Sequence, residues 1–143
     1  MFAQINNENG VLTFSRNIID QVVRDAFIPF KGKCWGGKYI GPGADAMYRL
    51  NMLDAPGIKE ISYGEEGVLI KVYVIIKLGT PIRKTLESLI SSMALDITEC
   101  LELPIDNIVI KLTAVAGNRN VAKRDISLDY YGHYIHAEDE KDE

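Results

Sequence analysis

The sequence predicts an α+β domain in which a four-stranded sheet carries two helices on one face. Three observations lead to this prediction. A length of 143 residues suits one domain, and 47% apolar with 25% charged residues is average for a folded chain. Apolar residues recur with a period of two in some segments and of about 3.6 in others. The expected order is strand, helix, glycine-rich segment, strand, strand, helix, strand, which favours a two-layer sandwich.

The first strand and helix are expected between residues 11 and 29. Val11 to Phe14 has the composition of a short strand, and Ser15 follows where its hydroxyl group could cap a helix. Pro29 is expected to end that helix. The apolar residues of the helix form one stripe, made by Ile18, Ile19, Val22, Val23, Ala26 and Phe27.

Residues 29–57 form a glycine- and proline-rich insertion. They hold six of the 12 glycines and three of the five prolines, without sustained periodicity. Only residues 44–53 are expected to form a short helix. So long a segment inside a compact domain is typical of a functional or mobile region.

Two strands are predicted next, Ile58 to Tyr63 and Val68 to Lys77, joined by a tight turn over residues 64–67. The second strand is apolar on one face and partly apolar on the other, so we expect it at the sheet centre. Its certainly buried face consists of Val68, Ile70, Val72, Val74 and Ile76.

A second helix and a last strand complete the predicted domain. Thr80 is expected to cap the helix, with Pro81 in its first turn. The stripe of this helix is Ile82, Leu86, Leu89, Ile90, Met93, Ile97 and Leu101, and Cys100 lies near it, so we expect Cys100 in the core. The strand from Asn107 to Ala116 follows, with Ile108, Ile110, Leu112 and Ala114 on one face.

The predicted domain spans residues 1–117, and residues 118–143 are expected to be an aromatic and then acidic tail. Five acids and one base between Glu138 and Glu143 account for the whole net charge of −4, so the rest of the chain is neutral. A neutral body lacks the positive field that draws proteins to phosphate backbones. Nucleic acid is therefore not an expected partner.

Neither a secretory signal nor a membrane span is predicted, because no apolar run approaches the roughly 20 residues that a bilayer requires. The two cysteines, Cys34 and Cys100, have neither CxxC nor zinc-site spacing, which favours a reducing cytoplasm. We predict no cofactor, no metal and no direct membrane insertion.

The segment from Gly32 to Tyr39 has the spacing of a phosphate-binding loop, G-x-x-x-x-G-K. However, Tyr39 stands where Ser or Thr would bind magnesium, and the segment follows a helix instead of a strand. The alternative function that remains is anion or nucleotide binding by residues 32–43, for which the candidate residues are Lys33, Gly36, Gly37 and Lys38. The simpler interpretation is a connector with Trp35 packed on the core.

Cys34 is a candidate nucleophile, since Lys33 and Lys38 would lower its pKa and favour the thiolate. Nucleophilic catalysis also requires a base, and the only histidines, His133 and His136, lie far along the chain. These two histidines could approach a metal ion, but a solvated tail is the favoured interpretation. No catalytic residue is predicted.

Aromatic residues outside the core pattern are the candidate interface residues: Trp35, Tyr130, Tyr131 and Tyr134. Such side chains bury a large area at small entropic cost. They could equally pack on the sheet of their own chain. A rival hypothesis is a nucleic-acid binder whose sheet presents Tyr73 and nearby lysines.

The order of segments over residues 10–116 resembles the alkaline shock, or Gls-type general stress, protein family of Gram-positive bacteria. The similarity begins with Gly-Val-Leu-Thr-Phe-Ser at residues 10–15. It continues through residues 57–61, 68–79 and 108–112, although residues 78–82 differ from the family's usual entry to the second helix. The resemblance implies a non-enzymatic, cytoplasmic scaffold of the cell-envelope stress response. It also implies a homo-oligomer that binds protein partners, including a membrane-anchor protein that would hold it at the membrane.

Overall fold

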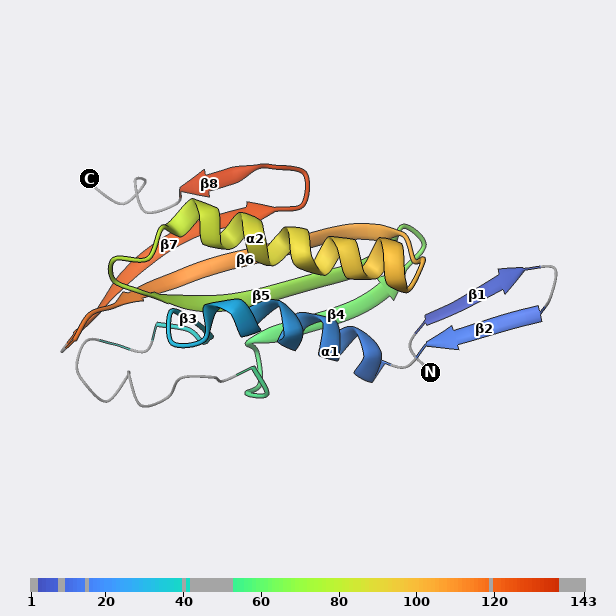
Figure 1. The fold of residues 1–143 in the computed structure, drawn as a ribbon, viewed down its shortest axis with the longest axis horizontal. Coiled ribbons are helices and arrows are strands. Elements are labelled where there is room, and N and C mark those ends of the chain that lie inside the picture. The colour runs from blue at the N-terminus through green and yellow to red at the C-terminus, as the bar shows by residue number, and fades with distance from the viewer. Residues whose placement is uncertain are drawn as a thin grey trace.

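The computed structural model describes residues 3–7, 10–14, 16–39, 41, 53–118 and 120–136. It shows an α+β protein with two helices, a main sheet of six strands and a separate two-stranded hairpin (Figure 1). The helices are α1 (Arg16–Phe27) and α2 (Ile82–Leu95). The strands are β1 (Ala3–Asn7), β2 (Gly10–Phe14), β3 (Cys34–Gly36), β4 (Lys59–Gly64), β5 (Gly67–Lys77), β6 (Ile105–Ala116), β7 (Val121–Asp129) and β8 (Tyr134–His136).

The α+β class is confirmed, whereas the predicted four-stranded sheet and its order are wrong. The main sheet runs β3-β5-β6-β7-β8, and β4 also pairs with β5. The predicted first strand, β2, is absent from this sheet because it pairs with β1 in the hairpin, which lies apart from the sheet in Figure 1. All neighbours in the main sheet are antiparallel except β5 and β6, which are parallel because α2 connects them.

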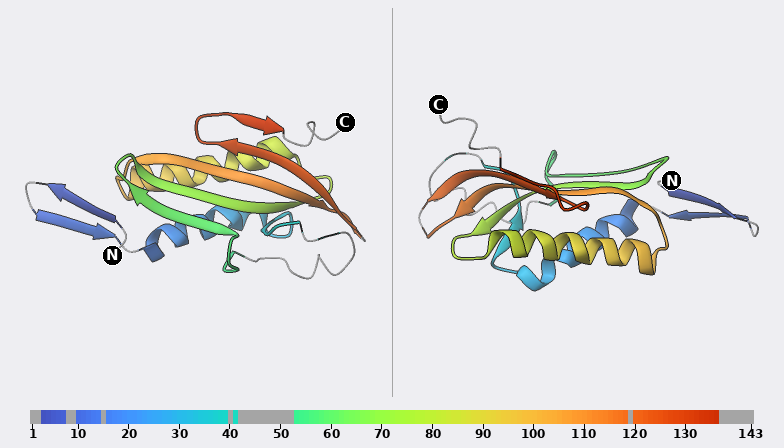
Figure 2. Two further views of the ribbon diagram at one scale, coloured as in Figure 1. Left: turned by 180° about the vertical axis from the view of Figure 1, so that it is seen from behind. Right: turned by 90° about the horizontal axis from the view of Figure 1, so that it is seen from above.

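Both helices lie on one face of the sheet, as predicted (Figure 2). On α1, the predicted stripe is buried except Ile18, which is 40% exposed. A short 3₁₀ turn, Ile28–Phe30, follows α1 around Pro29. The predicted cap, Ser15, lies outside the described residues.

The start and the end of α2 differ from the prediction. Pro81 occupies the cap position without any side-chain hydrogen bond, and Thr80 precedes it in a turn in which its own amide donates to Lys77. After Leu95 the chain makes one π-helical turn, Asp96–Cys100. Because a π turn is wider than an α turn, the apolar stripe changes direction. Ile97 stays buried, but Cys100 is exposed and is not part of the core.

The predicted boundary at residue 117 lies between two paired strands. β7 pairs with β6 over its whole length: Asp129 lies opposite Val109 at one end, and Val121 lies opposite Ala116 at the other. β8 then pairs with β7. Ile126 and Leu128 of β7 are buried against the helices in the main core. Residues 121–136 therefore belong to the sheet, and the acidic residues 138–143 lie outside the described part of the chain.

The insertion over residues 29–57 contributes one short strand, β3. β3 and β4 pair with different ends of the same side of β5, so the pairing passes from one strand to the other at Tyr73. The Gly37 amide donates to the Tyr73 carbonyl oxygen, and the Tyr73 amide donates to the carbonyl oxygen of Ile58. The predicted helix over residues 44–53 falls outside the described residues, apart from Leu53.

The buried residues form two clusters, one under the helices and a smaller one, and a bulge in β6 moves Ala114 into the smaller one. The register of β6 shifts between Leu112 and Ala114. Leu112 therefore packs with the helices, whereas Ala114 joins a small cluster with Trp35, Ile75, Ala116 and Val121. This cluster corrects the expectation that Ala114 shares a face with Ile108, Ile110 and Leu112.

Candidate binding face

Among the residues that the structure describes, no helix covers the face of the sheet opposite α1 and α2 (Figure 2). We call this the open face. Cross-strand partners project from the same face, so the register defines its rows of side chains. The row at the level of Tyr73 continues through Lys111 of β6 and Ser127 of β7 to Ile135 of β8.

Lysines gather around Tyr73 on the open face. The ammonium nitrogen of Lys38 lies 4.3 Å from the centre of the Tyr73 ring, and that of Lys71 lies 5.6 Å from it. Lys111 is the direct neighbour of Tyr73 on β6. Cation–π attraction holds the first two lysines at the ring. The parallel pairing of β5 and β6 thus brings together Lys71, Tyr73 and Lys111, and the segment after β3 adds Lys38.

A shallow hollow of about 250 Å³ adjoins this group. The hollow is lined by polar and apolar residues of β5, β6, β7 and β8. They are Tyr73, Lys111, Leu112, Thr113, Asp125, Ile126, Ser127 and Ile135. Ile135 is 57% exposed, so the hollow offers an apolar contact next to the lysines. Because Asp125 also lines the hollow beside Lys111, the open face offers charges of both signs next to an apolar contact.

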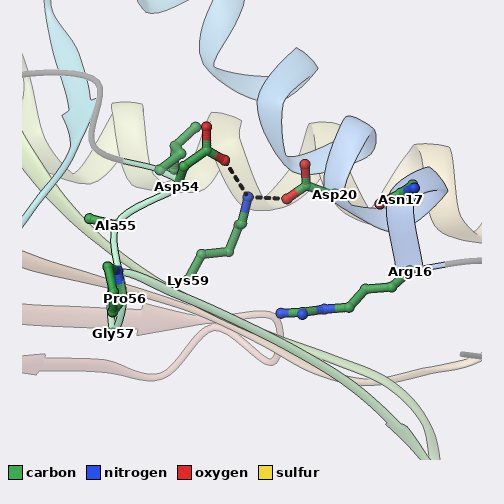
Figure 3. Close-up of a pocket in the computed structure, with 9 residues that line it drawn as sticks. Arg16, Asn17, Asp20, Asp54, Ala55, Pro56, Gly57 and Lys59 are labelled. Carbon is green, nitrogen blue, oxygen red and sulfur yellow. Dashed lines mark hydrogen bonds and ion pairs between the residues drawn. The ribbon is translucent and has the colours of Figure 1, made fainter.

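A second hollow, of about 380 Å³, lies between the start of α1 and the segment before β4 (Figure 3). Lys59 of β4 bonds to Asp20 of α1, and its ammonium nitrogen is 4.0 Å from a carboxylate oxygen of Asp54. Arg24 of α1 also pairs with Asp20, at 2.7 Å, and with Asp54. These four residues join the helix layer, the edge of the sheet and the end of the insertion.

Burial alone would raise the pKa of Asp20, but the hydrogen bonds and charges of Lys59 and Arg24 outweigh that effect and hold the pKa below 3.8. The Lys59 side chain is only 8% exposed, so these carboxylates offset the cost of burying its ammonium group. Because Lys59, the buried cation of this hollow, is already paired with Asp20, we interpret the ion pairs here as a structural contact between α1 and β4.

The candidate anion-binding residues do not form one cradle in the described part of the loop. Gly36 and Gly37 are buried, and the Gly37 amide is used in pairing with β5. A side chain at Gly36 would come within 2.6 Å of Leu53, which explains glycine there by close packing. Lys33 lines a hollow near the start of α2, whereas Lys38 lies over Tyr73.

Cys34 lies in the main core, where it is 2% exposed. Burial raises the pKa of its thiol to about 12, the opposite of the shift expected from Lys33 and Lys38. His133 lies in the β7–β8 turn and contacts Asp129 at 3.3 Å. Within the described ranges, no three His, Cys, Asp or Glu side chains gather closely enough to hold a metal ion.

The four candidate interface aromatics separate into two groups. Trp35 is 8% exposed and packs in the small cluster. Tyr134 packs against the main core, and the guanidinium carbon of Arg83 lies 4.5 Å from the centre of its ring. Tyr130 and Tyr131 are exposed by 40% and 59% and meet edge to face. Only this second pair remains a surface candidate, at the β7–β8 turn.

The sequence places lysines near Tyr73 but does not identify Lys71 and Lys111 as the ones that adjoin it. Both lysines alternate with apolar residues on predicted strands, and this pattern indicates that their side chains point away from the core. Their proximity, however, depends on the parallel register of β5 and β6, which periodicity does not contain.

Comparison with protein families, with curated proteins and with solved structures found no match for this chain. Among the described residues, no helix has the length and apolar character needed to cross a membrane.

Proposed function

We propose that this protein is a scaffold or interaction protein that binds protein partners on the open face of its sheet. One observation carries the proposal: the open face brings Tyr73 and three lysines together beside a hollow of about 250 Å³. The three lysines are Lys38, Lys71 and Lys111. None of them forms an ion pair with a carboxylate in the described part of the chain.

Three lysines against the carboxylates of Glu60, opposite Lys71, and of Asp125, in the hollow, leave a small positive excess on this face. Such an excess favours a partner that carries negative groups. Tyrosine adds contact area at small entropic cost. The same face is available over several strands, so an extended partner segment could contact more than one row. Binding, instead of chemistry at one reactive centre, is what such a surface favours.

The resemblance to alkaline shock proteins supports the same proposal. It suggests a cytoplasmic protein of the cell-envelope stress response that self-associates and binds a membrane-anchor protein. The open face would be the surface available for these contacts.

Two rival ligands have less support. The ring of Tyr73 already carries Lys38, so a nucleic-acid base could stack there only by displacing that lysine. For anions or nucleotides at residues 32–43, the buried and paired backbone of Gly36 and Gly37 leaves fewer free amides.

A photo-reactive phenylalanine analogue at position 73 tests the proposal in living cells. A matched analogue at Ser91, which is exposed on α2, serves as the control. We expect a covalent protein adduct from position 73 and none from position 91. The absence of any adduct at 73, or equal adducts at both positions, would contradict binding on the open face.

A further inference from the structure

We infer that one end of the helix layer is a docking surface for the acidic residues 138–143 of the same chain. We call these residues the acidic run. The docking surface, which we call the basic end, consists of residues 28–33, which follow α1, and residues 78–84, which include the start of α2. It lies on the helix side of the sheet instead of the open face, so the inference goes beyond the proposed function.

A hollow of about 360 Å³ joins the two segments of the basic end. Pro29, Phe30 and Pro81 give it apolar walls, and Lys33 and Lys84 give it positive charge. Among the described residues that line it, none is acidic. The hollow is therefore suited to receive carboxylate groups together with the aliphatic parts of their side chains.

The basic end has more cations than acids. Residues 28–33 and 78–84 contain four cations and neither Asp nor Glu. The four cations are Lys31, Lys33, Arg83 and Lys84. The acids that flank these segments on the two helices are engaged: Glu87 pairs with Arg83 at 2.9 Å, and Asp25 accepts a hydrogen bond from Gln21. In the described part of the chain, the three lysines form no ion pair with a carboxylate.

β8 brings the chain to the basic end. Tyr134 of β8 packs against the main core, and Arg83 of α2 lies over its ring, so β8 passes beside the first turn of α2 (Figure 1). β8 ends at His136, and Glu138 follows two residues later. Six extended residues span about 20 Å, whereas one helical turn is about 5 Å long. The acidic run can therefore reach the hollow at the start of α2.

The charge of the acidic run complements that of the basic end. Residues 138–143 are Glu-Asp-Glu-Lys-Asp-Glu and carry a net charge of −4, while the remaining residues sum to zero. Exposed ion pairs are individually weak, but β8 holds the two partners close, and a high effective concentration favours a contact within one chain. Any other anion must then displace the acidic run before it reaches Lys33 and Lys84.

Lys123 of β7 is a rival position for the acidic run. Continued antiparallel pairing beyond His136 and Ile126 would lead the chain along β7 past Asp125 toward Lys123. However, Lys123 already has a carboxylate nearby, since its ammonium nitrogen lies 3.9 Å from Asp125. The lysines of the basic end have no such partner among the described residues, and this difference favours the hollow.

Zero-length cross-linking with a carbodiimide tests the inference, because the reagent joins a carboxylate to an amine only where the two touch. The reaction is run on an equimolar mixture of unlabelled and ¹⁵N-labelled full chain. Mass spectrometry then identifies each linked pair of peptides and shows whether both come from one chain. We expect the acidic run to be linked to Lys33 or Lys84 within one chain, and the yield to fall as salt rises.

A peptide titration gives a second measurement that does not depend on cross-linking. In an amide variant, the five acids of the acidic run are replaced by Asn and Gln, and a labelled Glu-Asp-Glu-Lys-Asp-Glu peptide is added. The peptide should bind this variant at least about tenfold more tightly than it binds the full chain, whose own run occupies the hollow. Adding Lys84→Glu to the amide variant should weaken binding by about tenfold, whereas the matched change Lys123→Glu should leave it unchanged. Circular dichroism verifies that each variant is folded.

Three results overturn the inference. The first is a run that is linked mainly to Lys123 or to open-face lysines, or to no lysine at all. The second is a majority of mixed-isotope pairs, which would place the contact between chains. The third is equal peptide binding by the amide variant and the full chain. None of these results depends on the photo-cross-linking at position 73, so this inference and the proposed function can fail separately.

Discussion

The two faces of β5 differ sharply although they belong to one strand. Toward the helices, Val68, Ile70, Val72, Val74 and Ile76 are all fully buried. Toward the open face, Leu69 is 37% exposed, Lys71 and Tyr73 are partly exposed, and Ile75 is buried. The helix-covered face is buried along its whole length, whereas the open face is buried only at Ile75, in the small cluster with Trp35, and presents charge and aromatic surface at Lys71 and Tyr73.

The largest expected effect comes from truncating the helix-covered face. Ile70→Ala should lower the free energy of unfolding by about 2–5 kcal/mol, because it removes buried methyl groups and leaves a cavity. The neighbouring change Lys71→Ala, on the open face, should alter it by no more than about 0.5 kcal/mol. Urea denaturation of both variants measures the difference. Equal losses would show that the open face also supports the fold.

A smaller loss of stability is expected from breaking the ion pair between Asp20 of α1 and Lys59 of β4. Asp20→Asn leaves the ammonium group of Lys59, which is 8% exposed, without its nearest carboxylate. We expect a loss of about 1–2 kcal/mol at neutral pH, reduced because Asp20 is itself 25% exposed.

The pH dependence gives the sign of this contribution. Since folding lowers the pKa of Asp20 below 3.8, its stabilisation is fully present above that value and is lost as the pH falls through the lowered pKa. The gap between the wild-type chain and Asp20→Asn in urea denaturation should therefore shrink below pH 3.8. A gap that stays constant down to pH 2 would argue against the ion pair as its source.

The smallest effect is a difference in reactivity without a change in stability. Cys34 is buried on the helix-covered face with a pKa of about 12, whereas Cys100 is exposed after α2. A disulfide reagent at pH 8 should titrate one thiol in the folded chain and two in urea. The Cys100→Ser variant should show none until it unfolds. Fast labelling of Cys34 in the folded variant would mean that β3 opens readily.

Periodicity predicted those parts of the fold in which side chains alternate without interruption. The buried face of β5 and most of the stripe of α2 agree with the sequence. β7 was missed because Lys123, Arg124 and Asp125 interrupt its apolar pattern, although Ile126 and Leu128 lie in the core. The bulge before Ala114 was also unpredictable, because one inserted residue changes the face of the sheet without changing composition.

The candidate site was harder to predict, because sequence neighbours separate in the fold. Lys33, Cys34 and Lys38 are close in the chain, yet only Lys38 reaches the open face, and Cys34 points into the core. Conversely, Tyr73 and Lys111 are distant in the sequence and adjacent in the sheet. A local pattern cannot encode such a neighbour, since the register between strands determines it.

At Tyr73 the pairing of β5 passes from β3 to β4, and this arrangement affects which insertions the chain could tolerate. The backbone departs from β5 after Gly37 and rejoins it at Ile58, and both bonds are made to a single residue. Its two ends are therefore fixed side by side, whatever the length between them. Lengthening a closed loop costs little free energy, rising only with the logarithm of its size. Relatives and engineered versions could thus exchange whole inserts at this position while the rest of the sheet keeps its register.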